Sequence, residues 1–539
     1  MKLNQNSISR RGFLQGAAVA SLAMGAGLYG CSSANGSGED DSAPAQAAPS
    51  VWDIEELGEP AETLTADVCV VGGGGTGMAA SIQAKQLGLD VLLIEKHSQL
   101  GGSFSGTEGM FAIGTQWQKD AGIELNKDDL LVKAVEFHHY VASQELYKAF
   151  FDKSASNIEW CESLGIKFAE VRAMGASDPC WHVYEGAPAP GAQFVENMIK
   201  AVEKHEIRTE FELSGKKLLT NEDGSVAGLL AARADGTVVQ IDCPAVIVGT
   251  GGFSNNMGLV EELGNNPDLV AAMLDNGRTG DGIKMVKAAG GAMVSSPGTL
   301  MTGGPSVIGT SFGVSEAFAC GVQPAIWLNE RAQRYVREDM FERNFSYAGQ
   351  SSAQQKRVLS FVNQALVDRF ESGEGALVGV GTHILKGTQM PNLSRELESL
   401  IEMGIVAKGD TVEDLAAQFD LDGNALRATL DRYNEMCANG RDEDMFKPAE
   451  FMIAMEEGPY YLMDCYVSYL TTVGGVKVNP NAEVLRDDSS VIPGLYAGGC
   501  DAGGLYGDTY DVYVAPGSQA AWCIYTGRVA AEQAAAYIA

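Results

Sequence analysis

Residues 66–102 read ADVCVVGGGGTGMAASIQAKQLGLDVLLIEKHSQLGG and decide the fold class. An apolar run, Val68–Val71, enters a cluster of glycines, and a helical pattern over Met78–Leu87 follows it. A second apolar run, Val91–Ile94, then ends at an acidic residue. This order predicts a strand, a tight turn, a helix and a second strand, which together form the dinucleotide-binding unit of an α/β protein.

Three glycines of the turn have the spacing G-x-G-x-x-G. Gly72 permits the turn, Gly74 lets the backbone approach a pyrophosphate, and Gly77 lets the helix pack against the strand. The N-terminus of the helix then faces the phosphates, and Glu95 can accept a hydrogen bond from a ribose hydroxyl. We therefore predict a dinucleotide cofactor at this turn. The alternative is a glycine-rich turn in an α/β protein of another kind.

The composition limits the class of protein and the kinds of partner. A chain of 539 residues with 45% apolar residues is long enough for two or three globular domains. Its net charge of −32 argues against nucleic acid or anionic lipid as a partner. The ten cysteines include no C-x-x-C and no C-x-x-C-H sequence, so we expect no metal, no haem c and no iron–sulfur cluster. The sequence does not decide whether two of the cysteines form a structural disulfide bond.

Residues 1–31 have the pattern of an export signal. Ser9–Leu14 (SRRGFL) resembles the twin-arginine motif, and the apolar segment Gly16–Tyr29 that follows is too short to span a membrane as a mature helix. We therefore expect export by the twin-arginine route, which carries folded proteins. The destination is the extracytoplasmic face of the cytoplasmic membrane or the cell envelope.

The end of this signal, Leu28–Cys31, resembles a lipobox. A lipobox would make Cys31 the lipidated first residue of the mature protein and its only tie to the membrane. The alternative is ordinary cleavage nearby, which removes this cysteine. Small and polar residues follow, and they make residues 32–62 a flexible tether.

The glycine-rich segments that come later continue the nucleotide-binding domain. Residues 207–248 alternate short apolar runs with turn sequences, which predicts short strands. The apolar run Ala245–Val248 leads into Gly249–Phe253, as expected where a strand ends at the cofactor. Thr279–Gly282 (TGDG) opens a helix, where Asp281 can cap the helix or face a phosphate or ribose.

Residues 297–466 have a different texture, with longer amphipathic patterns. A strand is expected at Ala325–Asn329. The helical patterns cover Ser351–Phe370, Thr411–Phe419 and Asn424–Ala438. Glycine-rich segments then return, so we predict a nucleotide-binding domain in two pieces, 63–296 and 467–539, with the second domain inserted between them.

The motifs follow one another in a recognisable order: the unit that ends at Glu95, VIVGTGGF at 246–253, TGDG at 279–282, the inserted domain, TTVGGV at 471–476 and PGLYAGG at 493–499. This order resembles the soluble fumarate reductase / 3-ketosteroid dehydrogenase group of FAD-dependent oxidoreductases. The resemblance implies an enzyme that acts on CH–CH bonds with FAD. It also implies an α/β fold in which a two-part Rossmann-like FAD domain carries an inserted α+β capping domain. The export signal is similar to that of exported flavin reductases of anaerobic gut bacteria, such as cardiac glycoside reductase.

The resemblance places the cofactor contacts on small and polar residues within these motifs. They are Gly72, Gly74, Gly77, Glu95, Lys96, Gly102, Ser103, Gly251, Gly252, Asp281, Gly499, Cys500, Gly517 and Ser518. Cys500 stands where related enzymes have a polar residue that touches the ribityl chain, and a small buried filler is the alternative. Nothing in the sequence indicates a covalent flavin.

The sequence departs from the fumarate branch at the residues that hold a dicarboxylate. Ser296–Gly298 replaces His-Pro-Thr at the start of the cap, Thr471-Thr472 replaces a histidine, and Gly507–Tyr510 lacks an arginine. A substrate with two carboxylates would therefore lack its guanidinium partners. We place a fumarate- or urocanate-type carboxylate reductase behind other functions.

Tyr513–Ser518 (YVAPGS) resembles the Tyr-x-x-x-Gly-Ser pattern of ketosteroid dehydrogenases, in which the Tyr hydroxyl and the Gly amide hold a ketone oxygen. Gly517 would begin the last helix, where amides lack intrahelical partners and the dipole favours negative charge. The alternative is that Tyr513 is a packed aromatic residue and Gly517 only a helix-start glycine. Together with Tyr506 and Tyr510, this segment indicates an aromatic, weakly charged pocket.

These residues predict a reductase of an activated C=C bond in an α,β-unsaturated carbonyl compound, such as a steroid, a lactone or an aromatic enone. The β-carbon receives a hydride from flavin N5, Tyr513 and the Gly517 amide stabilise the enolate-like charge, and an acid protonates the α-carbon. In the fumarate branch this acid is an arginine, and its position falls here on Glu342, beside Arg343. Arg343 is the first candidate, Glu342 and Tyr347 follow, and a surface charge is the alternative for Arg343.

The source of electrons is inferred from what the sequence lacks. It contains one dinucleotide motif, without a second one or a haem motif. We therefore expect a separate redox partner, either a membrane cytochrome or a quinol dehydrogenase. Two other functions stay open: a ketosteroid-type dehydrogenase, which introduces a C=C bond, and a non-catalytic flavin-binding protein.

Overall fold

The central sheet has six strands in the order β19-β20-β11-β2-β3-β7. Their bounds are β2 (Val68–Val71), β3 (Val91–Ile94), β7 (Arg208–Glu210), β11 (Ala245–Val248), β19 (Glu483–Leu485) and β20 (Val491–Ala497). All pairings are parallel except that of β19 with β20. Every residue of β2, β3 and β11 is buried, as expected of a parallel sheet covered on both faces. The predicted strand–turn–helix–strand unit is confirmed.

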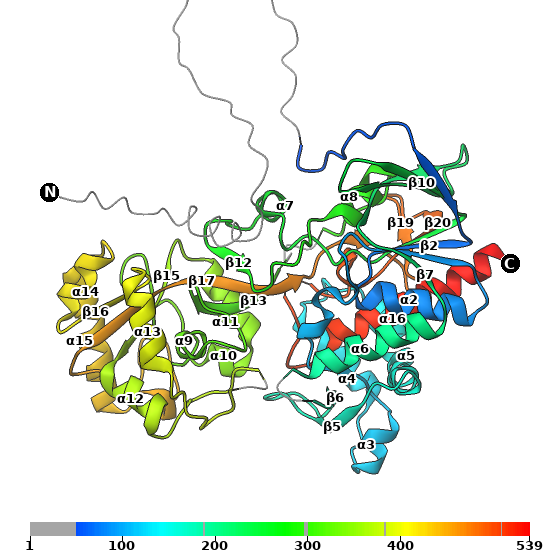
Figure 1. Cartoon of the computed structure of the whole chain (residues 1–539). Helices are drawn as coiled ribbons and strands as arrows, with labels where there is room; N and C mark the ends of the chain where they lie inside the picture. The colour runs from blue at the N-terminus through cyan, green and yellow to red at the C-terminus, as the bar shows by residue number, and fades with distance from the viewer. Residues whose placement is uncertain (1–49, 187–188, 296–299, 382–383, 508) are drawn as a thin grey trace, which may run out of the picture. The chain divides into compact units, whose positions relative to one another are not determined.

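This computed structural model describes residues 50–186, 189–295, 300–381, 384–507 and 509–539. Ile54–Ala539 form one compact unit (Figure 1). The predicted export signal, the lipobox, Ser296–Gly298 and one residue of Gly507–Tyr510 lie outside the described residues. Within the described ranges, no helix combines the length and the apolar character needed to cross a membrane.

Two long helices pack side by side against this sheet, α2 (Gly75–Gln86) and α16 (Ser518–Ile538) (Figure 1). Close packing depends on glycine. A Cβ added at Gly77 would lie 1.7 Å from the Gly72 carbonyl oxygen, and one added at Gly527 would lie 2.5 Å from the Thr76 carbonyl oxygen. The N-terminal strand β2 and the C-terminal strand β20 therefore belong to the same sheet, and the N-terminal helix α2 and the C-terminal helix α16 pack together against it.

Two smaller sheets flank the central one. The strands β1 (Glu62–Thr65), β10 (Val238–Asp242), β9 (Val226–Arg233) and β8 (Leu213–Thr220) pair in that order, which confirms the short strands predicted over 207–248. A three-stranded sheet pairs β4 (Gly109–Phe111), β6 (Trp181–Tyr184) and β5 (Phe168–Arg172). Besides α2 and α16, the helices of the nucleotide-binding domain are α3 (Gln116–Asp120), α4 (Lys127–Phe137), α5 (Gln144–Ser163), α6 (Pro190–Lys204), α7 (Met257–Glu262) and α8 (Asp281–Ala288).

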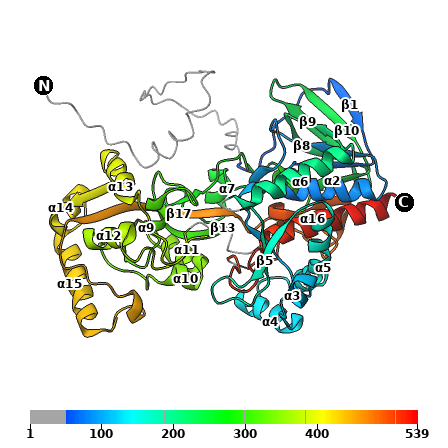
Figure 2. The same ribbon diagram turned by 60° about the horizontal axis from the view of Figure 1, so that its bottom comes forward.

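The cap is built on the long strand β17 (Tyr460–Thr472), drawn in orange in Figure 2. It pairs with β12 (Val270–Ala272), β13 (Leu300–Val307), β15 (Val358–Asn363) and β16 (Val406–Gly409), and β15 pairs with β14 (Ile326–Asn329). The cap helices are α9 (Glu316–Gly321), α10 (Met340–Arg343), α11 (Phe345–Ala353), α12 (Gln364–Ser372), α13 (Leu393–Glu402), α14 (Val412–Gln418) and α15 (Gly423–Asn439). The strand predicted at 325–329 and the helices predicted at 411–419 and 424–438 are confirmed. The boundary between 466 and 467 lies inside β17, so both domains share this strand.

The helix predicted over Ser351–Phe370 is wrong. There α11 ends at Ala353, β15 follows, and α12 begins at Gln364. All six residues of β15, VLSFVN, are buried, and the strand pairs on both sides with β14 and β17. A fully buried apolar run has no alternation that marks it as a strand, so its pairing partners decide its conformation.

A buried ion network supports the start of the cap. Arg334 donates from Nε and Nη2 to the two carboxylate oxygens of Glu338 at 2.7 and 2.8 Å, and from Nη2 to Asp442 Oδ2 at 2.7 Å. The Lys447 ammonium lies 3.4 Å from Glu338 and donates to the Ala325 carbonyl oxygen at 2.6 Å. These four side chains lie in the cap core and fix the segment that leads into α10.

Candidate active site

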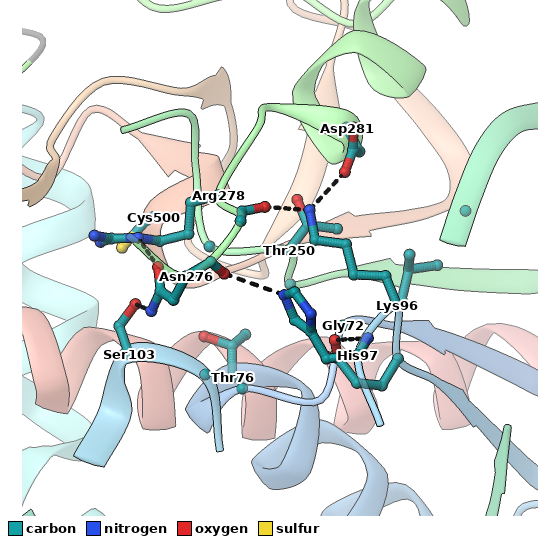
Figure 3. Close-up of a pocket in the computed structure, with 18 of the residues that line it drawn as sticks. Gly72, Thr76, Lys96, His97, Ser103, Thr250, Asn276, Arg278, Asp281 and Cys500 are labelled. Carbon is teal, nitrogen blue, oxygen red and sulfur yellow. Dashed lines mark hydrogen bonds and ion pairs between the residues drawn. The ribbon is translucent and has the colours of Figure 1, made fainter. Parts of the chain in front are cut away.

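A pocket opens where the parallel strands β2, β3 and β11 end, the place where ligands bind in folds of this kind (Figure 3). Its wall includes the glycine turn after β2, residues 94–97 after β3 and 249–251 after β11. Residues 276–278 and 213–215 close two other sides. The carboxyl-terminal part of the chain contributes two cysteines, Cys500 and Cys523.

The glycine turn has the geometry that a pyrophosphate requires. Gly72 has φ +102°, and a Cβ there would lie 2.5 Å from the Gly249 carbonyl oxygen. Gly74 is the N-cap of α2, and a Cβ added to it would meet no atom within 4 Å, so this position faces open space. The first turn of α2 carries no acidic residue, so its free amides offer an unopposed anion site.

Glu95 marks one end of the pocket. It is 8% exposed, and its two carboxylate oxygens accept from the Gly73 amide at 2.7 Å and the His97 amide at 2.8 Å. Each carboxylate oxygen keeps a second lone pair, so this geometry leaves room for the predicted ribose hydroxyl. The prediction that this end of the pocket holds the adenosine half of the cofactor is compatible with these contacts.

Lys96 crosses to the loop before α8. Its ammonium donates to the Gly277 carbonyl oxygen, to Thr279 Oγ1 at 3.0 Å and to Asp281 Oδ2 at 2.9 Å. Burial alone would raise the pKa of Asp281, but the Lys96 charge and these hydrogen bonds hold it below its ordinary value. Both residues line the pocket as predicted, and their ion pair ties the loop to β3.

Asp501 joins the two pieces of the nucleotide-binding domain and was missed in the sequence. It is fully buried, and its carboxylate accepts from the Thr250, Gly251 and Gly252 amides, the last two at 3.2 and 3.0 Å. Burial raises the pKa of Asp501 in spite of these donors. The signal that could have found it is an acid two positions after the Gly498-Gly499 pair.

Cys500 lies in the pocket wall, as the predicted cofactor contact requires. Its sulfur accepts from Thr471 Oγ1 at 3.0 Å and from Gln519 Nε2 at 3.2 Å. The Cys523 thiol, then Thr471 and the Arg278 charge, lower the pKa of Cys500 to about 7 against the opposing effect of burial. The position of Cys500 in the pocket wall fits the predicted cofactor contact, and its role as a contact or as a small filler stays a prediction.

Two buried polar atoms beside Cys500 are available to a ligand. Thr472 Oγ1 and Gln519 Oε1 are among the buried side-chain atoms of the described residues that have no hydrogen-bond partner. Unpaired buried polar atoms are rare in native proteins unless a bound molecule completes them. A ring system with its own donors and acceptors, as in FAD, fits here, whereas no group of three residues able to hold a metal ion occurs in the described parts of the chain.

The two groups predicted to hold a carbonyl oxygen both have partners in this structure. Gly517, with φ +77°, is the N-cap of α16, and its amide donates to Tyr510 Oη at 3.1 Å. Tyr513 Oη donates to the carbonyl oxygen of Phe341 on α10 at 3.2 Å. A bound carbonyl oxygen would replace these two neutral contacts, one of which joins the C-terminal segment to the cap.

Glu342 and Arg343, the predicted acids, are both exposed on α10. Partial burial raises the pKa of Glu342. Burial, and then the Glu342 carboxylate, raise the pKa of Tyr513, so this carboxylate acts electrostatically on the tyrosine. Tyr347, the third candidate, stacks on Phe137 with ring centroids 5.6 Å apart.

Four aromatic rings form a row that ends at Phe341, whose backbone carbonyl oxygen accepts the hydrogen bond from Tyr513. Tyr506 and Tyr510 lie edge to face at 5.5 Å, Tyr510 lies 6.2 Å from Phe345, and Phe345 lies 6.2 Å from Phe341. We call these four residues the aromatic cluster. It joins α10 and α11 of the cap to the segment that precedes α16, which agrees with the aromatic surroundings predicted for Tyr513.

The predicted cofactor residues divide into two groups. Those in the pocket wall are Gly72, Gly74, Glu95, Lys96, Gly102, Ser103, Gly251, Asp281 and Cys500. The others lie behind the wall: Gly77, Gly252, Gly499, Gly517 and Ser518. Ser518, for example, donates to Asp511 Oδ1 at 2.9 Å. Some residues of the pocket wall were not predicted from the sequence, because they are not part of a recognised motif: Thr76, His97, Asn276, Arg278 and Cys523.

The cysteines of the described residues are all free thiols. Nine are described, from Cys69 to Cys523, and seven of them are buried. The structure therefore contains no disulfide among them.

Comparison with known proteins identifies the family. The FAD_binding_2 family, described as an FAD binding domain, matches residues 67–512. The chain is 32% identical over 489 residues to the vinyl phenol reductase of Lactiplantibacillus plantarum, which covers 87% of this chain and 96% of that protein.

Two solved structures share the fold. The open conformation of a flavocytochrome c3 fumarate reductase superposes with a TM-score of 0.69 at 25% identity, covering 89% of this chain and 79% of that one. A 3-ketosteroid-Δ4-(5α)-dehydrogenase from Rhodococcus jostii superposes with a TM-score of 0.63 at 22% identity, covering 88% and 97%, and this shows the fold alone. The mixed α/β fold with an FAD domain and a capping domain is thus confirmed. The chain belongs to the FAD_binding_2 family and is an FAD-dependent oxidoreductase that acts on CH–CH bonds.

Proposed function

We propose that the protein is an exported reductase of the activated C=C bond in an aromatic α,β-unsaturated carbonyl compound. The observation that carries the proposal is the aromatic cluster beside Tyr513 and the Gly517 amide, at the junction of the cap and the C-terminal segment. An aromatic cluster next to two neutral hydrogen-bond donors suits an apolar ring that bears one carbonyl oxygen. The vinyl phenol reductase relative supports an aromatic substrate.

The chain's own residues would bind and polarise this substrate. FAD, when bound, supplies the hydride for the β-carbon of the double bond. Tyr513 and the Gly517 amide would exchange their present partners, the Phe341 carbonyl and the Tyr510 hydroxyl, for the substrate carbonyl oxygen. Donors placed where negative charge develops lower the barrier, and the start of α16 adds a favourable dipole.

We assign the proton for the α-carbon to Glu342 rather than Arg343. Partial burial raises the pKa of Glu342, which favours its protonated, proton-donating form, and the Glu342 charge acts on Tyr513. Replacing Glu342 by Gln should abolish most turnover and remove the alkaline limb of the pH–rate profile, because a general acid is active only while protonated, whereas Arg343→Gln should leave both nearly unchanged. The reverse pattern would make Arg343 the acid.

A second candidate is a ketosteroid-type dehydrogenase, favoured by the Tyr-x-x-x-Gly-Ser segment. One anaerobic experiment separates the two directions. Holoenzyme reduced with dithionite is mixed with 4-phenyl-3-buten-2-one, with 4-vinylphenol and with fumarate, and flavin absorbance is followed. Reoxidation by 4-phenyl-3-buten-2-one but not by fumarate is the expected result, and reoxidation by 4-vinylphenol alone would show that the carbonyl group is not required. Bleaching of the oxidised enzyme by a saturated ketosteroid, without reoxidation by either aromatic alkene, would favour the dehydrogenase.

Export and electron supply belong to the same proposal. The SRRGFL segment and the lipobox-like Leu28–Cys31 would deliver the folded protein outside the cytoplasm, with Cys31 as its lipid anchor. A membrane cytochrome or a quinol dehydrogenase would then supply electrons. Cell fractionation after Arg10→Lys/Arg11→Lys exchange tests the route: retention of the protein in the cytoplasm is expected, and unchanged export would contradict it.

A further inference from the structure

We propose that Arg278 is the cation that makes this pocket bind reduced FAD more tightly than oxidised FAD. The inference depends on FAD as the cofactor and is independent of the substrate. FAD that has taken up two electrons and one proton carries an extra negative charge on its ring system. A protein cation held beside the ring favours that state and raises the reduction potential.

The position of Arg278 follows from the order of the pocket wall. Glu95 marks the adenosine end, and the glycine turn around Gly74 marks the pyrophosphate. The flavin half must therefore extend away from Glu95. Figure 3 shows Arg278 and Cys500 together on one side of the pocket, with Lys96 and Asp281 on the other.

The guanidinium group is buried and firmly held. Arg278 is 5% exposed. Its Nε donates to Asn276 Oδ1 at 2.8 Å, Nη1 to the Leu470 carbonyl oxygen at 2.8 Å and Nη2 to the Leu274 carbonyl oxygen at 3.2 Å. Asn276 is itself oriented by donation from its Nδ2 to Ser103 Oγ at 2.6 Å. Three of the five guanidinium N–H groups are thereby used, and one on each Nη is left for a ligand.

The acceptors around Arg278 are all neutral. Among the described residues, no carboxylate lies within ion-pair distance of its guanidinium, unlike Arg334 or Arg357. Burial lowers the pKa of Arg278, yet an arginine keeps its charge in proteins. A buried charge without a counter-ion is costly, so a further negative group is expected in the pocket.

Cys500 and the cofactor can supply that negative group. Cys500 lies on the same side of the pocket as Arg278, and the Arg278 charge is one of the causes that lower the pKa of its thiol. When FAD is reduced, the new negative charge arises in the same half of the pocket. Arg278 therefore gains a partner on reduction, which is the differential interaction that shifts a redox equilibrium.

A contact with the pyrophosphate is the competing explanation, and it makes a different prediction. The pyrophosphate is equally negative in both redox states, so such a contact would strengthen FAD binding without changing the potential. Reduction potential and FAD affinity must therefore be measured on the same variants.

The experiment compares wild type with Arg278→Gln, Arg278→Lys and Arg528→Gln. Arg528 is the control, because it is a half-buried arginine whose partners Gln83, Ser156 and Asn157 lie outside the pocket wall. Holoenzyme is equilibrated anaerobically with a reference dye, and FAD affinity is measured by titrating apoprotein with oxidised FAD.

In Arg278→Gln, we expect the ratio of reduced to oxidised enzyme at a fixed dye potential to fall about tenfold, with less than threefold change in the affinity for oxidised FAD. Arg278→Lys and Arg528→Gln should stay close to wild type. An unchanged ratio, or a loss of oxidised FAD affinity without a change in ratio, would overturn the proposal. Should the Gln variant not fold, wild type decides: a potential below that of free FAD would mean that the pocket favours oxidised FAD, which also overturns it.

Discussion

At the scale of single residues, alkylation of Cys500 can be used to probe the pocket. The Cys523 thiol, the Thr471 hydroxyl and the Arg278 charge lower the pKa of Cys500 to about 7, and only the thiolate reacts rapidly with alkylating agents. Alkylation of apoprotein by iodoacetamide should therefore rise as the pH increases through about 7 and fall below it, with Cys500→Ser as control. FAD should protect this cysteine, and half-maximal labelling only above pH 8.5 would contradict the assigned environment.

The role of Tyr513 can be separated from that of a packed ring. Removing one hydrogen-bond donor to a developing oxyanion lowers kcat by roughly 10²–10³-fold. Tyr513→Phe should show such a loss with FAD content unchanged. Tyr525→Phe is the matched control, because its hydroxyl donates to the Pro480 carbonyl oxygen away from the site. A loss of less than threefold would leave Tyr513 a packing residue.

Residue-level prediction succeeded where a motif dictates backbone geometry. Gly72 and Gly74 could be placed from spacing alone, because only glycine fits a positive φ or a close ligand approach. Arg278 could not, because its partners Leu274 and Leu470 are backbone carbonyls, and the second is 192 positions along the chain. Backbone acceptors have no residue type, so they leave no trace in the sequence.

At the scale of elements, the network around Glu338 decides how α10 is presented. Removing one partner of a buried ion pair leaves the others uncompensated and costs about 3–5 kcal/mol. Glu338→Gln should lower the free energy of unfolding by this amount, because Arg334 and Lys447 would both lose their shared carboxylate. Urea denaturation measures it, and Arg432→Gln, which removes exposed ion pairs, should give no measurable change.

The elements themselves were predicted best where periodicity was clear. The amphipathic pattern of α15 predicts a helix, and the structure has one there. For β15 the sequence predicts part of a helix, and the structure has a strand. Its six buried residues satisfy either conformation, and the choice is made by β14 and β17. Sequence separations of about thirty and one hundred residues put those partners outside any local window.

At the scale of the whole molecule, Asp501 couples cofactor binding to the closure of the nucleotide-binding domain. Its carboxylate holds three amides of the Thr250–Gly252 turn, which forms one wall of the pocket. Asp501→Ala should weaken FAD binding at least tenfold. The rise in Tm produced by a fixed excess of FAD should shrink accordingly, because ligand stabilisation follows occupancy. Asp488→Ala, on an exposed turn, is the control, and equal FAD affinity in both variants would refute the coupling.

The insertion of β20 between β11 and β19 has a consequence for biosynthesis. While the ribosome is still synthesising the cap, Gly72 and Glu95 have already been made. The strand β20, which pairs with β11, and the pocket residues Cys500 and Cys523 have not. The nascent chain therefore has a phosphate-binding turn without a closed site. We therefore expect stable FAD binding only after residues 491–523 have left the ribosome. The cofactor would then bind a chain whose synthesis is almost complete.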